Sequence, residues 1–175
     1  MDFRTAYENL EGRMKAMAES EGAVYLPNIA PSGPVDLVFI CMEPSLGGWA
    51  RSRAEAQEKV EAGFRNFLSS FEDFLLHFAI REFLCTSGER YHLTDISKGA
   101  MLVKSAQRER GRRYDRWLSL LCDELSLVAK PGAHVFAVGG AVYRYLVNRD
   151  FPWDLTRIMH YSGMAGAARK AAVIG

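Results

Sequence analysis

The stretch Val35-Asp36-Leu37-Val38-Phe39-Ile40-Cys41 decides the fold class of this chain. Most of its residues are β-branched or aromatic, and the run lies between Pro34 and the Glu43-Pro44 pair. A short apolar run between turn signals is typical of a strand that is buried on both faces. Strands of this kind occur in parallel sheets with helices on both sides, so the run predicts an α/β domain.

Other segments of the chain, on both sides of this strand, have patterns that predict strands and helices. Further strands are expected at 91–96, 134–138 and 155–159, and helices at 3–18, 53–84, 115–129 and 141–147. Parallel strands that alternate with helices need crossover connections, which predicts a three-layer α/β/α domain around a central four-stranded parallel sheet. We expect a single domain over 1–175, with an N-terminal helix and loop at 1–34 and the core at 35–175.

Composition narrows the class of protein. The chain has 175 residues, of which 49% are hydrophobic and 25% are charged, as in ordinary soluble domains. It lacks an apolar run of the roughly 18 residues that a membrane span needs, and its first twenty residues are too polar for a signal peptide. Three widely spaced cysteines argue against disulfides and zinc. We expect a cytoplasmic monomer with no metal, no cofactor and no membrane partner.

The segment 53–84 carries a regular apolar stripe. Its large apolar residues recur at spacings of three and four: Phe67, Phe71, Phe74, Leu75 and Phe78. This spacing is typical of a helix that faces the core, and we expect the stripe to pack on the sheet.

Polar side chains follow three of the expected strands. In parallel sheets, ligands bind outside the carboxyl ends of the strands, and Glu43, Asp95 and His160 lie at such ends. Glu43 can activate a water as a general base, or it can cap the amides of the following loop. His160 can donate to a developing anion or shuttle a proton, or it can be structural. We expect Glu43 and His160 to face one cleft.

A basic segment follows the second expected strand. From Lys98 to Arg113 there are six basic residues and a single acid, although the net charge of the chain is only +1. We expect this segment to be a loop that contacts the phosphates of single- or double-stranded DNA; a solvated surface is the alternative. The phosphate contacts are assigned to Lys98, Lys104, Arg108, Arg110 and Arg112.

The order of the motifs resembles the uracil-DNA glycosylase superfamily. Three motifs carry the resemblance: Ile40-Cys41-Met42-Glu43-Pro44-Ser45, Leu93-Thr94-Asp95-Ile96-Ser97-Lys98 and His160-Tyr161-Ser162-Gly163-Met164. A helix with a leucine-rich face, a Lys-Pro pair and a strand that ends in a glycine turn lie between the last two. The resemblance covers about 35–169 and implies a uracil-DNA glycosylase-like fold.

The resemblance also implies an activity. Such enzymes flip a base out of the DNA and hydrolyse its bond to deoxyribose. It implies that Glu43 orients the attacking water and that His160 stabilises the departing base anion. The implied substrate contacts are Pro44, Ser45, Trp49, Asp95, Ser162 and Met164. Of these, Met164 lies where the family has a wedge residue that fills the gap left by the base.

Asp95 departs from the family pattern, which has asparagine at this position. An ionised carboxylate only accepts hydrogen bonds, which leaves three alternatives: Asp95 is protonated, the favoured base presents an amino or imino hydrogen there, or the chain does not act on uracil. We expect an ionised Asp95 and weak or absent activity on uracil. Capping of the following loop is the alternative role. Two other functions remain open for the chain: a non-catalytic nucleic-acid-binding module, and an enzyme that acts on free nucleosides.

Overall fold

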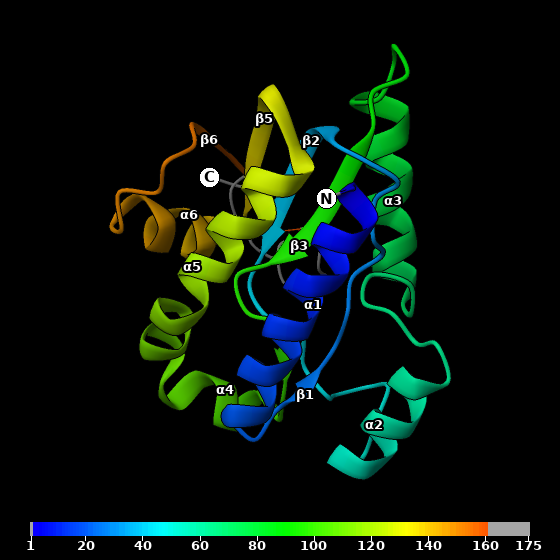
Figure 1. The fold of residues 1–175 in the computed structure, drawn as a ribbon, viewed down its shortest axis with the longest axis vertical. Coiled ribbons are helices and arrows are strands. Elements are labelled where there is room, and N and C mark those ends of the chain that lie inside the picture. Colours follow the sequence, from blue (N-terminus) through cyan, green and yellow to red (C-terminus); the bar gives the residue numbers. More distant parts are fainter. Residues whose placement is uncertain (1, 161–175) are drawn as a thin grey trace, which may run out of the picture.

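The computed structural model describes residues 2–160, and for 106–108 it describes the backbone alone (Figure 1). In chain order the elements are α1 (Phe3–Ser20), β1 (Val24–Tyr25), β2 (Val35–Cys41), α2 (Arg53–Glu61), α3 (Phe71–Phe83), β3 (Tyr91–Asp95), β4 (Gly99–Ala100), α4 (Val103–Arg108), α5 (Arg110–Val128), β5 (Ala129–Val138), α6 (Gly140–Val147) and β6 (Leu155–Ile158).

The main sheet has the strand order β3-β2-β5-β6, and all its neighbouring strands run parallel. In the register, Phe39 of β2 pairs with Leu93 of β3 on one side and with Phe136 of β5 on the other. The expected α/β class and four-stranded parallel sheet are confirmed. The structure adds a small antiparallel pair of β1 and β4, which the sequence patterns did not indicate.

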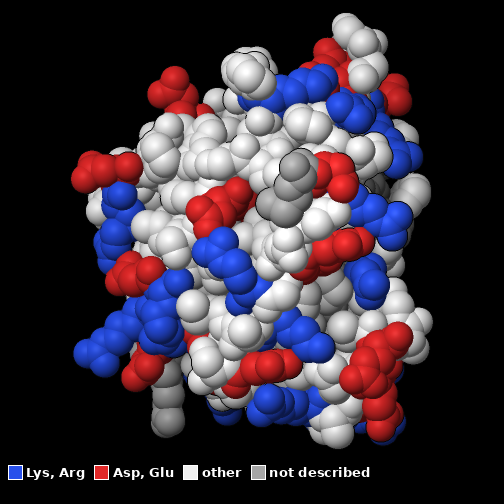
Figure 2. All heavy atoms as spheres, viewed as in Figure 1, with Lys and Arg blue, Asp and Glu red and all other residues white. Residues whose placement is uncertain are grey.

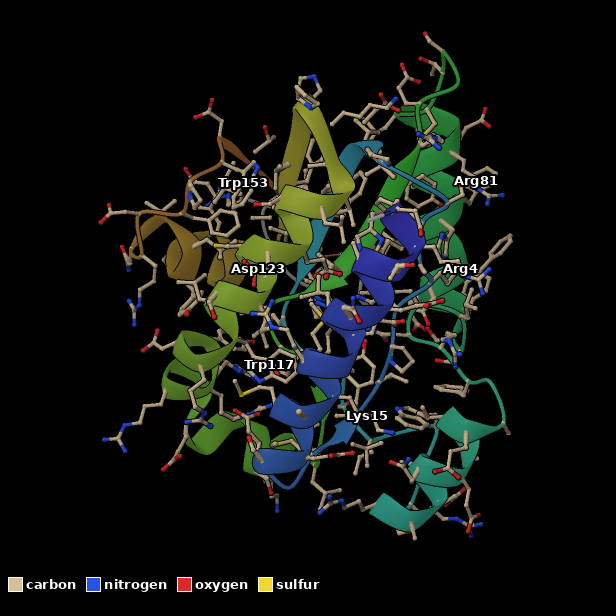
Figure 3. All side chains as sticks on the ribbon, in the orientation of Figure 1. Arg4, Lys15, Arg81, Trp117, Asp123 and Trp153 are labelled. Carbon is tan, nitrogen blue, oxygen red and sulfur yellow. The ribbon has the colours of Figure 1, made fainter. Side chains whose placement is uncertain are left out.

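Helices pack on both faces of the sheet. Val38 and Ile40 of β2 belong to a core cluster with residues of α1, α5 and α6, whereas Leu37 and Phe39 pack with residues of α3. Figure 1 shows α1 and α5 side by side in front of the sheet and α3 beside β3. Trp117 fills the space between α5 and α1 and is fully buried (Figure 3). The burial of β2 on both faces is as its sequence predicts.

The segment expected as one helix at 53–84 is two helices, α2 and α3. Of the expected apolar stripe, Phe67 lies before α3 and is buried in the core, whereas the four residues on α3 face outward. Ser70 and Asp73 form a capping box at the start of α3, and Leu76 and Ile80 face the sheet. The side of α3 that carries Phe71, Phe74 and Phe78 is exposed, with exposed fractions of 69%, 62% and 51%. The prediction that these phenylalanines face the core is wrong. The buried face of α3 is the one that carries Asp73, Leu76 and Ile80.

The basic segment is helical and does not form the expected loop. It contains α4 and the first turn of α5, which begins at Arg110 and not at 115. At the other end, α5 continues directly into β5. Pro131 and Gly132 lie in β5 where its pairing with β2 is irregular. Within the described part of the chain, no helix is long and apolar enough to cross a membrane.

Candidate functional site

The strand ends bring the candidate residues to one edge of the sheet. Asp95 is the last residue of β3, Glu43 follows β2, and His160 follows β6. Because the strands are parallel, these positions share the carboxyl edge. The strand β5 lies between β2 and β6, so Glu43 and His160 are separated by two strand spacings of about 5 Å each. That they face one cleft stays a prediction.

Glu43 is held by two residues of α5. Its Oε1 accepts hydrogen bonds from Nη2 and Nε of Arg110, at 2.7 and 3.0 Å, and its Oε2 accepts one from the Tyr114 hydroxyl. The Glu43 side chain is only 6% exposed. Burial raises the pKa of Glu43, and the hydrogen bond and charge of Arg110 act against this rise. The arrangement therefore provides a buried carboxylate of increased basicity, covered by Arg110.

His160 packs against the turn between β5 and α6. Gly139 there has φ of +94°, a conformation that favours glycine, and a Cβ at this position would lie 3.6 Å from Cβ and Cδ2 of His160. The turn also receives support from β6, because the Gly139 amide donates to the carbonyl of Ile158 at 2.8 Å. Burial lowers the pKa of His160, so the ring is mainly neutral at pH 7 and carries one N–H donor.

Asp95 is 2% exposed, and Nδ2 of Asn66 donates to its Oδ2 at 2.5 Å. Burial raises the pKa of Asp95 to about 8; the charge of Lys98 acts against this rise, and the charges of Glu43 and Glu124 add to it. At pH 7 the Asp95 carboxyl is therefore mainly protonated. Of the alternatives for Asp95 this favours the protonated acid, and the ionised carboxylate that we expected prevails only in more alkaline solution, because desolvation disfavours the charged form.

A chain of buried hydrogen bonds extends behind Asp95. Asn66 Nδ2 lies 3.2 Å from Oδ1 of Asn28, and Nδ2 of Asn28 donates to the Thr94 hydroxyl at 3.3 Å. The Thr94 hydroxyl in turn donates to Oε2 of Glu124 at 2.7 Å. These contacts connect the loop before α3, the end of β3 and the middle of α5 into one network.

Lys98 belongs to the same network and is not at the surface. It is 1% exposed, and its Nζ lies 2.6 Å from Oε2 of Glu124, whose Oε1 accepts a hydrogen bond from His92 at 3.0 Å. Burial acts to raise the pKa of Glu124, but Lys98 and His92 outweigh it and lower the pKa to about 2. The expectation that Lys98 contacts phosphates is wrong, because its ammonium group is buried and pairs with the carboxylate of Glu124.

The other basic residues of 98–113 divide into those paired with carboxylates and those exposed to solvent. Arg110 is bound to Glu43, and the buried Arg113 lies 3.3 Å from Glu21 and donates to the carbonyl of Gly99 at 3.2 Å. Lys104 and Arg112 are exposed, and the Arg108 side chain lies outside the described part. Figure 2 shows Lys and Arg over α4 and the start of α5, with Asp and Glu among them.

The remaining expected substrate contacts lie in the loop after β2 or beyond the described residues. Pro44 is buried, and the Trp49 ring stacks on Phe64 with 4.6 Å between the ring centroids. Trp49 Nε1 donates to the carbonyl oxygen of Ser45 at 2.6 Å. One face of Trp49 is therefore occupied by another ring. Ser162 and Met164 lie outside the described residues.

Sequence reasoning did not single out four residues that shape this edge: Asn28, Asn66, Tyr114 and Glu124. Glu124 had a detectable signal, because it lies seven residues after Trp117, on the apolar face of α5. A carboxylate on such a face predicts a buried partner. Asn28 and Asn66 had none, since asparagine in a loop between helices and strands is ordinary turn chemistry.

Among the described residues, no group of three or more His, Cys, Asp or Glu side chains is placed to hold a metal ion. Comparisons with protein-family models, with curated proteins and with solved structures produced no match to this chain. The resemblance of its motifs to the uracil-DNA glycosylase superfamily therefore stays a prediction, and the site is interpreted from its own geometry.

Proposed function

We propose that the chain is a DNA glycosylase-like hydrolase with a uracil-DNA glycosylase-like fold, which cleaves the N-glycosidic bond of a flipped damaged or deaminated base. The observation that carries the proposal is the placement of Asp95, Glu43 and His160 after three strands at one carboxyl edge of the sheet. This reaction needs a group that reads the base, a general base and a donor to the departing anion, and Asp95, Glu43 and His160 can fill these roles.

In the proposed reaction, water attacks C1′ of the deoxyribose and the bond from C1′ to the base nitrogen breaks. The bonding electrons leave with the base, which departs as an anion while the sugar develops positive charge. The Glu43 carboxylate stabilises that positive charge and accepts the proton of the attacking water. The neutral His160 ring donates its N–H to the anionic base, where a fixed donor in a partly desolvated site is most effective.

The protonated state of Asp95 supports a particular kind of base. Because Asn66 donates to Oδ2, that oxygen acts as the acceptor, and the acid proton belongs on Oδ1. A neutral acid oriented in this way donates to a carbonyl oxygen, as the family's asparagine does. We therefore include uracil and other oxo bases among the proposed substrates at neutral pH, and we limit the expected preference for amino-bearing bases to alkaline solution.

One observation favours the non-catalytic nucleic-acid-binding module instead. Both carboxylate oxygens of Glu43 are engaged, Oε1 by Arg110 and Oε2 by Tyr114. Arg110 and Tyr114 cover Glu43, whose side chain is 6% exposed, so an attacking water needs a movement of these side chains to reach it. A chain that bound nucleic acid without cleaving it would have no need for that movement.

The decisive experiment scores abasic-site formation on a panel of oligonucleotides, each carrying one modified base. We expect base release by the wild type and a loss of about 100-fold or more in Glu43→Gln and His160→Asn, since positioned proton-transfer groups contribute rate factors of this order. The matched controls are Glu8→Gln and His134→Asn, both exposed and distant from this edge, and they should retain full activity. DNA binding without abasic sites on any base would refute the hydrolase and support the binding module.

A further inference from the structure

The orientation of the Asp95 carboxyl depends on a residue from another part of the chain. Asn66 precedes α3 by several residues, yet its Nδ2 lies 2.5 Å from Oδ2 of Asp95 at the end of β3. Its backbone is also fixed, because the Asn66 amide donates to the carbonyl of Pro27 at 2.9 Å. A contact that holds Asn66 in place therefore also holds the hydrogen bond from Asn66 to the Asp95 carboxyl.

The residue after Asn66 has an unfavourable backbone conformation. Phe67 has φ of +60°, in the left-handed region that a bulky side chain rarely adopts. It is nevertheless 4% exposed and packs in the core cluster that contains Leu76 and Ile80 of α3. A strained conformation of this kind persists only where the surroundings hold it, and such positions concentrate at functional sites.

His77 of α3 supplies the contact that holds this conformation. Its Nε2 lies 2.9 Å from the carbonyl oxygen of Phe67, which can only accept, so Nε2 carries the proton. In the neutral ring Nδ1 is then an acceptor, and the Tyr91 hydroxyl donates to it at 2.6 Å. The Phe67 carbonyl thereby fixes the tautomer of His77, and the Tyr91 hydroxyl adds a second contact that fixes the orientation of the ring.

These contacts form a circuit that begins and ends on one strand. Tyr91 is the first residue of β3 and Asp95 is the last, and the path between them runs through His77, Phe67 and Asn66. We propose that His77 and Tyr91 are positioning residues that hold Asn66 against Asp95 and so set which oxygen of that carboxyl accepts and which donates. The consequence for reading a base rests on the proposed function; the positioning itself does not.

The charged groups near Asp95 come from every element around it: Lys98 after β3, Glu43 after β2, Glu124 on α5 and Asp73 on α3. Lys98 donates to the backbone carbonyl of Asp95 at 3.3 Å and not to its side chain. Among the described residues, Asn66 is the donor to the carboxyl oxygens. Variants of His77, Tyr91 and Asn66 alter none of these charges, so a change in the Asp95 titration reports the Asn66 hydrogen bond.

The test is a carbon-13 NMR titration of the side-chain carboxyl of Asp95 in the full chain, with the signal assigned by its loss in Asp95→Asn. Asn66→Leu removes a hydrogen bond that favours the ionised carboxylate, and we expect the pKa of Asp95 to rise by about one unit. Tyr91→Phe and His77→Leu should shift it in the same direction by a smaller amount. The double variant Asn66→Leu with Tyr91→Phe should match Asn66→Leu alone, because Tyr91 acts through Asn66.

A rescue variant and a control sharpen the test. His77→Gln keeps an N–H donor toward the Phe67 carbonyl and should return the Asp95 titration toward the wild type. Tyr25→Phe is the control, because the Tyr25 hydroxyl bonds Glu11 and lies outside the circuit. An unchanged Asp95 titration in Tyr91→Phe, which removes a single oxygen and keeps the ring, would overturn the proposal, as would additive shifts in the double variant. The titration needs no substrate, so inactivity on every base would refute the proposed function alone.

Discussion

Burial has opposite outcomes at Asp95 and Glu124, two enclosed carboxyl groups of the same network. Desolvation prevails at Asp95 and raises its pKa to about 8, since its hydrogen-bond donor is the uncharged amide of Asn66. At Glu124 the ammonium of Lys98 and the ring of His92 prevail and lower the pKa to about 2. At the scale of the residue, the partner decides whether a buried carboxyl is an acid or a carboxylate.

The raised pKa of Asp95 predicts a pH-dependent stability difference. Between the unfolded value of about 3.9 and the folded value of about 8, the folded chain holds one more proton, so this contribution to stability falls as the pH rises through that window. It becomes constant above pH 8. Urea unfolding of wild type and Asp95→Asn across this range measures the term by difference. A difference that grows in favour of the wild type between pH 5 and pH 8 would contradict the raised pKa.

The ion pair of Lys98 and Glu124 predicts a large cost when one partner is removed. Glu124→Gln leaves the buried ammonium of Lys98 without its counter-charge, and the free energy of unfolding should fall by about 3–5 kcal/mol. Glu8→Gln, an exposed control on α1, should change it by less than about 0.5 kcal/mol. Equal stability of the two variants would show that Lys98 finds another partner or reaches water.

At the scale of the element, α3 shows how a helix with two apolar stripes chooses its buried face. The broad stripe of Phe71, Phe74 and Phe78 has the greater hydrophobicity, but Leu76 and Ile80 are the residues packed on β2 and β3. The phenylalanines instead form a ladder on the outer side, with ring centroids 6.3 and 6.4 Å apart. The buried residues of α3 are Asp73 of the capping box, Leu76 and Ile80, whose spacing places them on one face of the helix.

The orientation of α3 predicts which truncation destabilises the fold. Leu76→Ala leaves a cavity against the sheet and should lower the free energy of unfolding by about 2–5 kcal/mol. Phe74→Ala removes a larger side chain from an exposed position and should change it by less than about 0.5 kcal/mol. Chemical denaturation of both variants measures the two effects. The reverse order would mean that the phenylalanine stripe faces the core after all.

At the scale of the whole molecule, the chain is nearly neutral, and its exposed positive charges are dispersed and do not form one continuous positive surface. Three cations of the basic segment are already paired with carboxylates: Arg110 with Glu43, Arg113 with Glu21 and Lys98 with Glu124. Arg113 and Lys98 are buried, and the Arg110 side chain is 32% exposed. Lys104 and Arg112 remain exposed over α4 and the start of α5 (Figure 2). Any attraction for a nucleic-acid backbone on this segment therefore rests on fewer groups than its composition suggests.

This distribution predicts a modest salt dependence of DNA binding. The double variant Lys104→Ala with Arg112→Ala should reduce the log–log slope of affinity against salt by about 0.9 for each lost contact on a duplex, or about 0.7 on a single strand. The measurement is fluorescence anisotropy with a labelled oligonucleotide at several salt concentrations. Arg4→Ala, which changes an exposed arginine on α1, should leave the slope unaltered. An unchanged slope in the double variant would place the DNA elsewhere.

The sequence by itself determined the parts of this protein that depend on neighbours along the chain. The apolar run 35–41 predicts a strand buried on both faces, and the alternation of such runs with helices predicts the parallel sheet and the edge that carries Glu43, Asp95 and His160. These features follow from backbone preferences and local periodicity, which act over a few residues.

Only the tertiary structure decided which side chains meet across that edge. Asn66 lies 29 positions from Asp95, and Lys98 lies 26 positions from Glu124. A local pattern marks Glu124 as a carboxylate that needs a buried partner, but it does not identify the partner, because the pairing energies depend on burial and on charges brought together by folding. The same long-range packing leaves the phenylalanines of α3 exposed, raises the pKa of Asp95 and buries Lys98. The fold class was therefore readable from the sequence, and the chemical state of the site was not.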